Sequence, residues 1–252
     1  MKKILIATLI LSAGAVVNVA GAEILQVGTE TSSPPLTYLD VNSGRQVGFD
    51  IDLINAVGKK AGFQADVRSM GFDALIPALR TGSIDIMISG VAVTDKRKKV
   101  VNFSEPYLRN GYSFMVKTEN AASVKTMKDL ENKTLCAQLG SEGANVMRAI
   151  PGTTVKTFDA PATAYIEIAS GGCFGMLYDR AFNAYYLSKE KGKASGLVQV
   201  EVQGADKHDY DVAIAVRKED KKLLTRINNG LAQIKANGTY RQIYEKWFGK
   251  AK

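Results

Sequence analysis

The chain has 252 residues, 46% of them hydrophobic and 23% charged, and its 33 basic residues outnumber its 25 acidic ones. The positive charge is spread along the sequence and does not alternate with aromatic residues in one stripe, which argues against nucleic-acid binding. Two cysteines and one histidine are too few for a structural zinc site, which normally takes four Cys or His ligands. We expect no metal and no cofactor, and place His208 in a solvent-exposed loop.

The first 22 residues resemble an export signal. Lys2 and Lys3 give it a positive start, the stretch ILIATLILSAGAVV is apolar, and Ala20-Gly21-Ala22 provides a small-residue cleavage site. An uncleaved anchor is the alternative, but the apolar run is shorter than the roughly 20 residues of a transmembrane helix. We therefore expect a cleaved signal peptide and an exported, soluble mature protein.

Strand and helix patterns alternate in the first part of the chain. Ile51, Ile54 and Val57 share one face of a helix, while Gly62 and Gly82 stand where helix ends are expected. The pattern predicts, in chain order, a strand over 24–30, a helix over 48–62, a strand over 65–70, a helix over 72–82 and a strand over 84–90.

A second alternation follows an apolar segment at 113–117 and a polar linker at 118–133. It predicts strands over 134–140, 154–159, 173–179 and 197–202, with helices over 142–150, 161–171 and 180–192. The chain closes with a strand over 211–216 and helices over 221–238 and 239–249. Such alternation is typical of an α/β protein with mainly parallel sheets flanked by helices. Because the last strand follows the second round, we expect the chain to return there to the first domain.

Polar residues collect where the predicted strands end, which is where open parallel sheets bind ligands. Together with Arg97, just downstream of one strand end, they form a mixed-charge set that suits a zwitterion. The strand-end residues are Glu30, Ser89-Gly90, the turn 138–143 and Asp179. Each has a plainer interpretation: Asp179 can cap the next helix, Phe72 can be a core aromatic, and Arg97 can be an exposed neighbour of three lysines.

Cys136 and Cys173 lie at or just before predicted strands. In an oxidising compartment the two can form a disulfide, but buried thiols are equally compatible with their positions. The sequence leaves both alternatives open.

Three sequence blocks resemble the polar amino-acid-binding proteins of bacterial ABC importers, family 3 of the extracellular solute-binding proteins. They are GFDIDLINAVGKKAG, FDALIPALRTGSIDIMISGVAVTDKRKKVVNFSEPY and KANGTYRQIYEKWFG. The resemblance implies a two-lobed periplasmic-binding-protein (Venus-flytrap) fold with two hinge crossings. Residues 23–109 with 213–252 are expected in lobe 1, 113–207 in lobe 2, and the hinge near 108–112 and 209–213.

The resemblance also implies roles at the α-groups of the ligand. Arg97 matches the arginine that holds the α-carboxylate, and Asp179 the acid that receives the ammonium. Gly90 and Ala92 match positions whose backbone contacts these α-groups, and Ser89 stands beside them at the strand end.

Further residues match the rest of the family's pocket. Ser141 and Glu142 match a turn that adds donors to the carboxylate, Glu30 and Gln138 fall where side-chain specificity is decided, and Phe72 falls where an apolar wall stands. There are two departures. Ser33 stands where many relatives carry an aromatic residue, and Glu142 replaces a small residue of the turn.

The surroundings of Arg97 agree with such a site. Thr94 and Asp95 predict a helix start, yet basic residues 96–99 crowd the helix end that already carries partial positive charge. A ligand carboxylate can compensate this charge, and the planar guanidinium binds it with two parallel hydrogen bonds.

The resemblance implies a periplasmic monomer that captures a polar or basic L-amino acid (Arg, Lys, His or Gln) for an ABC permease of the inner membrane. One alternative is an enzyme resembling cyclohexadienyl dehydratase, with Glu30 or Glu142 as its acid. Another is an amino-acid sensor on the same fold. We expect a binding protein and not an enzyme.

Overall fold

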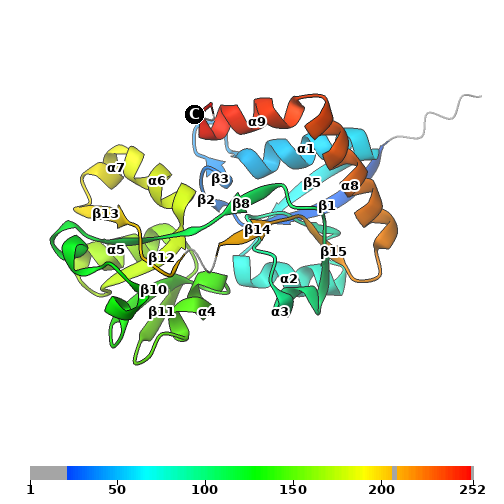
Figure 1. The fold of residues 1–252 in the computed structure, drawn as a ribbon. Helices are drawn as coiled ribbons and strands as arrows, with labels where there is room; N and C mark the ends of the chain where they lie inside the picture. Colours follow the sequence, from blue (N-terminus) through cyan, green and yellow to red (C-terminus); the bar gives the residue numbers. More distant parts are fainter. Residues whose placement is uncertain (1–21, 206–208, 251–252) are drawn as a thin grey trace, which may run out of the picture.

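The computed structural model describes residues 22–205 and 209–250, which form two lobes joined by paired segments (Figure 1). The expected export signal, apart from Ala22, and His208 lie outside the described residues. Within the described ranges, no helix combines the length and apolar character needed to cross a membrane.

The first lobe is built on a five-stranded sheet in the order β5-β1-β6-β15-β7. Helices α1, α8 and α9 lie on one side of it and α2 and α3 on the other (Figure 1). Its strands are β1 (Glu23–Thr29), β5 (Phe63–Ser69), β6 (Ile86–Met87), β7 (Val101–Phe103) and β15 (Ala215–Arg217). Its helices are α1 (Phe49–Ala61), α2 (Phe72–Thr81), α3 (Asp95–Lys98), α8 (Lys221–Ala236) and α9 (Thr239–Phe248).

The helix ends expected at two glycines are confirmed. Gly62 and Gly82 cap α1 and α2 in the left-handed conformation, with φ of 78° and 79°. Glycine adopts this conformation without the steric cost that a Cβ brings, so the chain can turn sharply into the next strand.

A three-stranded sheet that sequence reasoning did not predict lies at the entry to α1. It consists of β2 (Ser32–Ser33), β3 (Thr37–Asp40) and β4 (Arg45–Val47). The turn between β3 and β4 includes Asn42, Ser43 and Gly44, a composition typical of hairpin turns. This small sheet holds Ser33 at the edge of the lobe.

The second lobe has a sheet in the order β11-β10-β12-β9-β13. The expected 118–133 linker contains two 3₁₀ turns (Thr118–Ser123 and Met127–Leu130), and the helix expected over 180–192 is divided at Lys189. The strands are β9 (Tyr112–Lys117), β10 (Thr134–Gln138), β11 (Thr154–Phe158), β12 (Gly175–Asp179) and β13 (Leu197–Val200). The helices are α4 (Glu142–Arg148), α5 (Pro161–Ser170), α6 (Arg180–Ser188) and α7 (Glu190–Lys193).

Two antiparallel segments, β8 (Leu108–Asn110) and β14 (Tyr210–Val212), run side by side between the lobes (Figure 1). The single strand expected over 211–216 is therefore two strands, because β14 pairs with β8 whereas β15 pairs inside the first sheet. Each sheet contains one reversed strand, β15 in the first and β9 in the second, antiparallel to both its neighbours. The other strands of each sheet share one direction, so the sheets are mixed but mainly parallel, as expected for the fold class.

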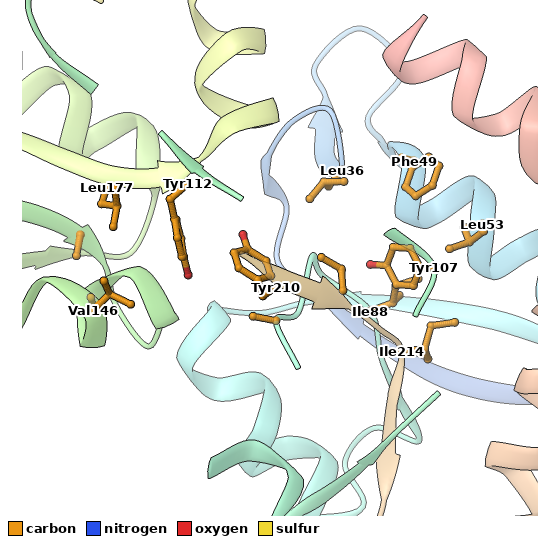
Figure 2. Packing of buried hydrophobic residues seen from close by; sticks show 14 of the residues in the cluster. Leu36, Phe49, Leu53, Ile88, Tyr107, Tyr112, Val146, Leu177, Tyr210 and Ile214 are labelled. Atoms are coloured by element: carbon orange, nitrogen blue, oxygen red, sulfur yellow. The ribbon is translucent and has the colours of Figure 1, made fainter. Parts of the chain in front are cut away.

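The hydrophobic core continues from one lobe to the other through tyrosines at the crossings. Tyr112 and Tyr210 have ring centroids 5.0 Å apart and lie between the lobes (Figure 2). They join a cluster that reaches Phe49 in the first lobe and Leu177 in the second. Tyr112 and Tyr210 therefore belong both to the shared core and to the floor of the space between the lobes.

Cys136 and Cys173 form a disulfide inside the second lobe, with 5.7 Å between their Cα atoms. Both residues are buried against the core that contains Tyr165 and Phe182. This decides between the two alternatives that the sequence left open.

Candidate functional site

A cavity between the two lobes contains most of the polar residues singled out from the sequence. The space, including part that is open to solvent, is about 430 Å³. It is lined by Ser33, Leu36, Phe72, Ser89, Gly90, Ala92, Arg97, Tyr112, Gln138, Ser141, Glu142, Gly143, Tyr178, Asp179 and Tyr210. Nine of the ten sequence-predicted residues are therefore brought together, and the tenth, Glu30, lies behind Ser33.

Arg97 is buried, with 7% of its surface exposed, while the three neighbouring lysines are exposed. Its Nη1 donates to the Ala92 carbonyl at 2.9 Å and its Nη2 to the Gly140 carbonyl of the other lobe at 3.2 Å. The guanidinium carbon lies 5.4 Å from the centre of the Phe72 ring, so Phe72 combines a cavity wall with a cation–π contact. Among the described residues, Arg97 forms no ion pair.

The short helix α3 fixes the Arg97 backbone. Thr94 is its N-cap, and its hydroxyl accepts a hydrogen bond from the Arg97 N–H at 3.2 Å, as the sequence predicted. Burial lowers the pKa of the Arg97 guanidinium, and the negative charge of Glu142 opposes this effect. The cavity therefore presents a positive group whose burial is not balanced by a contacting carboxylate.

Gly90 is held by a buried acid that sequence reasoning did not single out. The Gly90 N–H donates to Asp50 at 2.8 Å, and the Tyr107 hydroxyl donates to the same carboxylate at 2.9 Å. Burial raises the pKa of Asp50 to about 7, which these two hydrogen bonds oppose. Gly90 has a φ of 60°, where a side chain is strained, and a Cβ there would lie 2.7 Å from the Leu36 side chain, so the position favours glycine. Its carbonyl is the backbone group left for another partner.

Ala92 lies opposite Val212 in an isolated antiparallel bridge. The two backbone hydrogen bonds of this bridge are made by Val93 and Ala213, at 2.8 and 3.2 Å. The Ala92 N–H stays outside these bonds while the residue lines the cavity.

Asp179 reaches the cavity from the end of β12. It precedes α6, but its side chain makes no capping hydrogen bond; instead it accepts a hydrogen bond from the Tyr210 hydroxyl. Burial raises the pKa of Asp179 to about 7, the charge of Asp50 adds to this, and Arg97 opposes it. Asp179 therefore occupies the N-cap position of α6 without capping the helix through its side chain.

The turn before α4 is held by its own side chains. The Ser141 hydroxyl accepts from the Ala144 N–H at 3.2 Å and donates to the Gln138 carbonyl at 2.8 Å. Glu142 lines the cavity, and its carboxylate accepts from Asn145 on the same helix at 2.9 Å. Its charge raises the pKa of Arg97, so Glu142 contributes negative charge to the arginine end of the cavity.

Glu30 is 5% exposed and does not point directly into the cavity. Its carboxylate accepts hydrogen bonds from the Ser32 N–H at 2.7 Å, from the Ser32 hydroxyl and from the Ser33 hydroxyl at 2.6 Å. Burial raises the pKa of Glu30, and these hydrogen bonds oppose the rise. Ser33, noted from the sequence as a missing aromatic, takes the position facing the cavity.

Three tyrosines of the cavity were missed by sequence reasoning. Tyr112 and Tyr210 lie on the segments expected to cross between lobes, and such segments necessarily form the floor of the space between them. Their position in the predicted hinge was therefore a usable signal. Tyr178 is next to Asp179 at a predicted strand end, but an aromatic residue there is equally typical of a core.

The cavity combines a buried cation, Arg97, with a half-buried acid, Asp179, contributed by different lobes. In the described part of the chain, neither forms an ion pair. No cluster of three or more His, Cys, Asp or Glu side chains suited to a metal occurs among residues 22–205 and 209–250. The arrangement suits a small molecule that carries both an anionic and a cationic group.

Comparisons with known proteins agree with this arrangement. The family model of the bacterial extracellular solute-binding proteins, family 3, matches residues 25–250. The putative ABC transporter arginine-binding protein 2 of Escherichia coli K12 is 32% identical, over 99% of this chain and 100% of its own length. The structure of an ancestral arginine-binding protein bound to arginine is 38% identical, with a TM-score of 0.83, over 91% of this chain and 100% of that one.

A third similar structure is that of an ancestral amino-acid-binding protein described as a precursor of cyclohexadienyl dehydratase. It is 37% identical, with a TM-score of 0.79, and covers 89% of this chain and 95% of its own. The family match and the likeness in fold both extend over nearly all of the described chain, and the cavity is consistent with them. The chain belongs to the bacterial extracellular solute-binding proteins of family 3.

Proposed function

We propose that this solute-binding protein captures an L-amino acid by its α-carboxylate and α-ammonium groups. One observation carries the proposal: buried Arg97 and half-buried Asp179 line one cavity from different lobes, and in the described chain neither has an ion-pair partner. A buried charge without a partner is costly, and a zwitterion between the two lobes compensates both charges at once.

The α-carboxylate is assigned to the arginine end. Arg97 binds it through its planar guanidinium, and the Ala92 N–H and the turn of Ser141 and Glu142 add donors. The ammonium is assigned to Asp179 and to the Gly90 carbonyl, whose N–H is already taken by Asp50. Phe72 forms the wall beside the arginine.

The side chain of the ligand is assigned to the end with Ser33, Gln138 and Tyr178, with Glu30 behind. The negative charge of Glu30 favours a ligand with N–H donors, so arginine, lysine, histidine and glutamine are the candidates. The arginine-binding relative and the arginine-bound structure support this class. Glu142 also lines the cavity, but its charge acts at the arginine end and is not part of this preference.

Capture is assigned to a rotation of the lobes about β8 and β14, with lobe boundaries as expected from the sequence. The described conformation has contacts between lobes: Arg97 donates to the Gly140 carbonyl, and the rings of Tyr38 and Tyr185 lie 6.4 Å apart. A ligand stabilises such a closed form only through contacts that improve on closure. The cross-lobe position of Arg97 and Asp179 meets this requirement.

The captured amino acid is then delivered to an ABC permease in the inner membrane. The protein acts in the periplasm as a monomer, after its signal peptide is cleaved, and without a cofactor. The names of its relatives support the link to ABC transport.

Dehydratase activity is the second candidate, because one similar structure is described as a precursor of cyclohexadienyl dehydratase. Glu142, one of the two acids considered from the sequence for this role, lines the cavity. Incubation with prephenate and arogenate separates the candidates: a binding protein produces no phenylpyruvate or phenylalanine, whereas an enzyme does.

A thermal-shift screen of the purified mature protein against the twenty amino acids tests the binding function. Arginine, lysine, histidine or glutamine should raise the melting temperature most. A dominant shift with glutamate or leucine contradicts the assigned ligand class, and no shift with any amino acid contradicts amino-acid capture.

A further inference from the structure

Two hydroxyl groups meet across the cavity at its side-chain end. Ser33 comes from β2 of the first lobe and Tyr178 from β12 of the second, and their oxygens are 3.5 Å apart. At this separation a hydrogen bond between them is weak at best, because O–H···O bonds normally measure about 2.7–2.8 Å. Each hydroxyl has one hydrogen to donate, so its stronger partner decides what it offers to the cavity.

The hydrogen of the Ser33 hydroxyl is committed to Glu30. The Ser33 oxygen lies 2.6 Å from one carboxylate oxygen of Glu30, and an ionised carboxylate only accepts hydrogen bonds. The other carboxylate oxygen is taken by the N–H and the hydroxyl of Ser32. Ser33 therefore faces the cavity with its lone pairs.

The hydrogen of the Tyr178 hydroxyl is committed to Gln138. The Tyr178 oxygen lies 2.9 Å from the Gln138 Oε1, and the Gln138 Nε2 donates to the Asp159 carbonyl at 3.4 Å. This longer second contact agrees with an amide whose carbonyl side faces the tyrosine. Tyr178 also faces the cavity with lone pairs.

The structure assigns to Ser33 and Tyr178 the role of an acceptor pair that selects N–H donors on the ligand side chain. A nitrogen about 2.9 Å from each oxygen fits beside two oxygens that are 3.5 Å apart. Glu30 is then a positioning residue, which acts through Ser33 by orienting its hydroxyl. The assignment rests on the proposed amino-acid binding and deepens it.

The acceptor pair should discriminate between ligands by the hydrogen-bonding groups of their side chains more than by side-chain size. A guanidinium, ammonium or amide group donates to both oxygens, whereas a carboxylate brings only further lone pairs and a methyl group leaves the lone pairs of both hydroxyls without a donor. Covering these acceptor lone pairs with an apolar group removes them from water without supplying a donor, so the selection acts against apolar side chains of the same length.

Calorimetry with L-arginine and L-norleucine tests the assignment on full-length mature protein. Tyr178→Phe removes one acceptor and keeps the ring that packs against Phe182. Binding of arginine should weaken about tenfold to a hundredfold, the range for a hydrogen bond to a charged group, while norleucine stays within about threefold. Ser33→Ala should also weaken the binding of arginine more than that of norleucine. Glu30→Gln should lower the ratio of the arginine affinity to the norleucine affinity.

Tyr244→Phe in α9 is the matched control, because Tyr244 packs on Phe49 outside the cavity and should leave both affinities unchanged. Equal weakening of both ligands by Tyr178→Phe, or unchanged arginine affinity, overturns the acceptor pair alone. If the wild-type protein binds no amino acid, both the acceptor pair and the proposed function are wrong.

Discussion

Replacement of Arg97 by alanine tests the anionic end of the site. The side chain is buried, donates to two backbone carbonyls and contacts no carboxylate among the described residues. Its loss leaves a ligand carboxylate buried without a cation and near the negative charge of Glu142. Loss of one partner of a buried charge pair costs about 2–5 kcal/mol, so affinity should fall roughly thirtyfold to a few thousandfold.

The same substitution should affect the empty protein much less. Arg97 is desolvated without a charged partner, so its removal relieves a cost while it loses two hydrogen bonds and the contact with Phe72. We expect the free energy of unfolding of the ligand-free variant to lie within about 1–2 kcal/mol of the wild-type value. A large loss of binding with a small loss of stability distinguishes a ligand-binding arginine from a structural one.

Isothermal titration calorimetry with L-arginine near pH 8, together with urea unfolding of the ligand-free protein, measures both effects. Lys98→Ala is the matched control: the Lys98 side chain is 57% exposed and, within the described residues, its ion pair is with exposed Asp95, so both quantities should stay near wild type. An Arg97→Ala affinity within threefold of wild type would remove Arg97 from the site and refute the reasoning.

Other substitutions test the remaining parts of the account. Asp179→Asn should weaken amino-acid binding by about tenfold or more in calorimetry, since the ammonium loses its counter-charge; unchanged affinity contradicts this. Because burial raises the pKa of Asp179 to about 7, the acid is protonated below that pH and must release its proton to bind an ammonium. Wild-type affinity should therefore fall as pH drops from 8 to 5, and this slope should flatten in Asp179→Asn; an equal slope in both argues against Asp179. The raised pKa also means that the ligand-free fold binds this proton more tightly than the unfolded chain does. The stability that the bound proton contributes is present at low pH and is lost as pH rises through about 7. Gly140→Ala should hinder closure, because φ is +76° and the new Cβ meets Asp73 at 2.9 Å; small-angle scattering with saturating ligand should give a larger radius than wild type, and an identical radius contradicts the prediction. Replacing Cys136 and Cys173 by alanine should lower the free energy of unfolding by about 3–4 kcal/mol, because the disulfide closes a loop with a sequence separation of 37; a loss below 1 kcal/mol in urea melts contradicts that value.

Much of the fold was predictable from local patterns. Apolar spacing in α1 and glycines at helix ends determine where those helices lie, since both effects act within a few residues. The segment 211–216 was misjudged because its apolar run is continuous. Its break into β14 and β15 arises from a change of pairing partner, which depends on the tertiary arrangement and leaves no local signal.

The site was predictable where backbone topology decides the position. Gln138 and Asp179 end strands β10 and β12, which meet at one edge of the sheet, and Arg97 stands out by its unfavourable place in a helix. The direction of Glu30 was not predictable, because it depends on hydrogen bonds from the turn at Ser32 and Ser33. Tyr178 was not distinguishable from a core aromatic until its hydroxyl was seen beside Gln138.

A crystal structure of the protein with its bound amino acid tests the central claim most directly. The account predicts the α-carboxylate against the Arg97 guanidinium, with two N–H···O contacts of about 2.7–2.9 Å, and the ammonium against Asp179 in the same cavity. A ligand whose α-groups contact neither residue, or a ligand bound outside the space between the lobes, contradicts it.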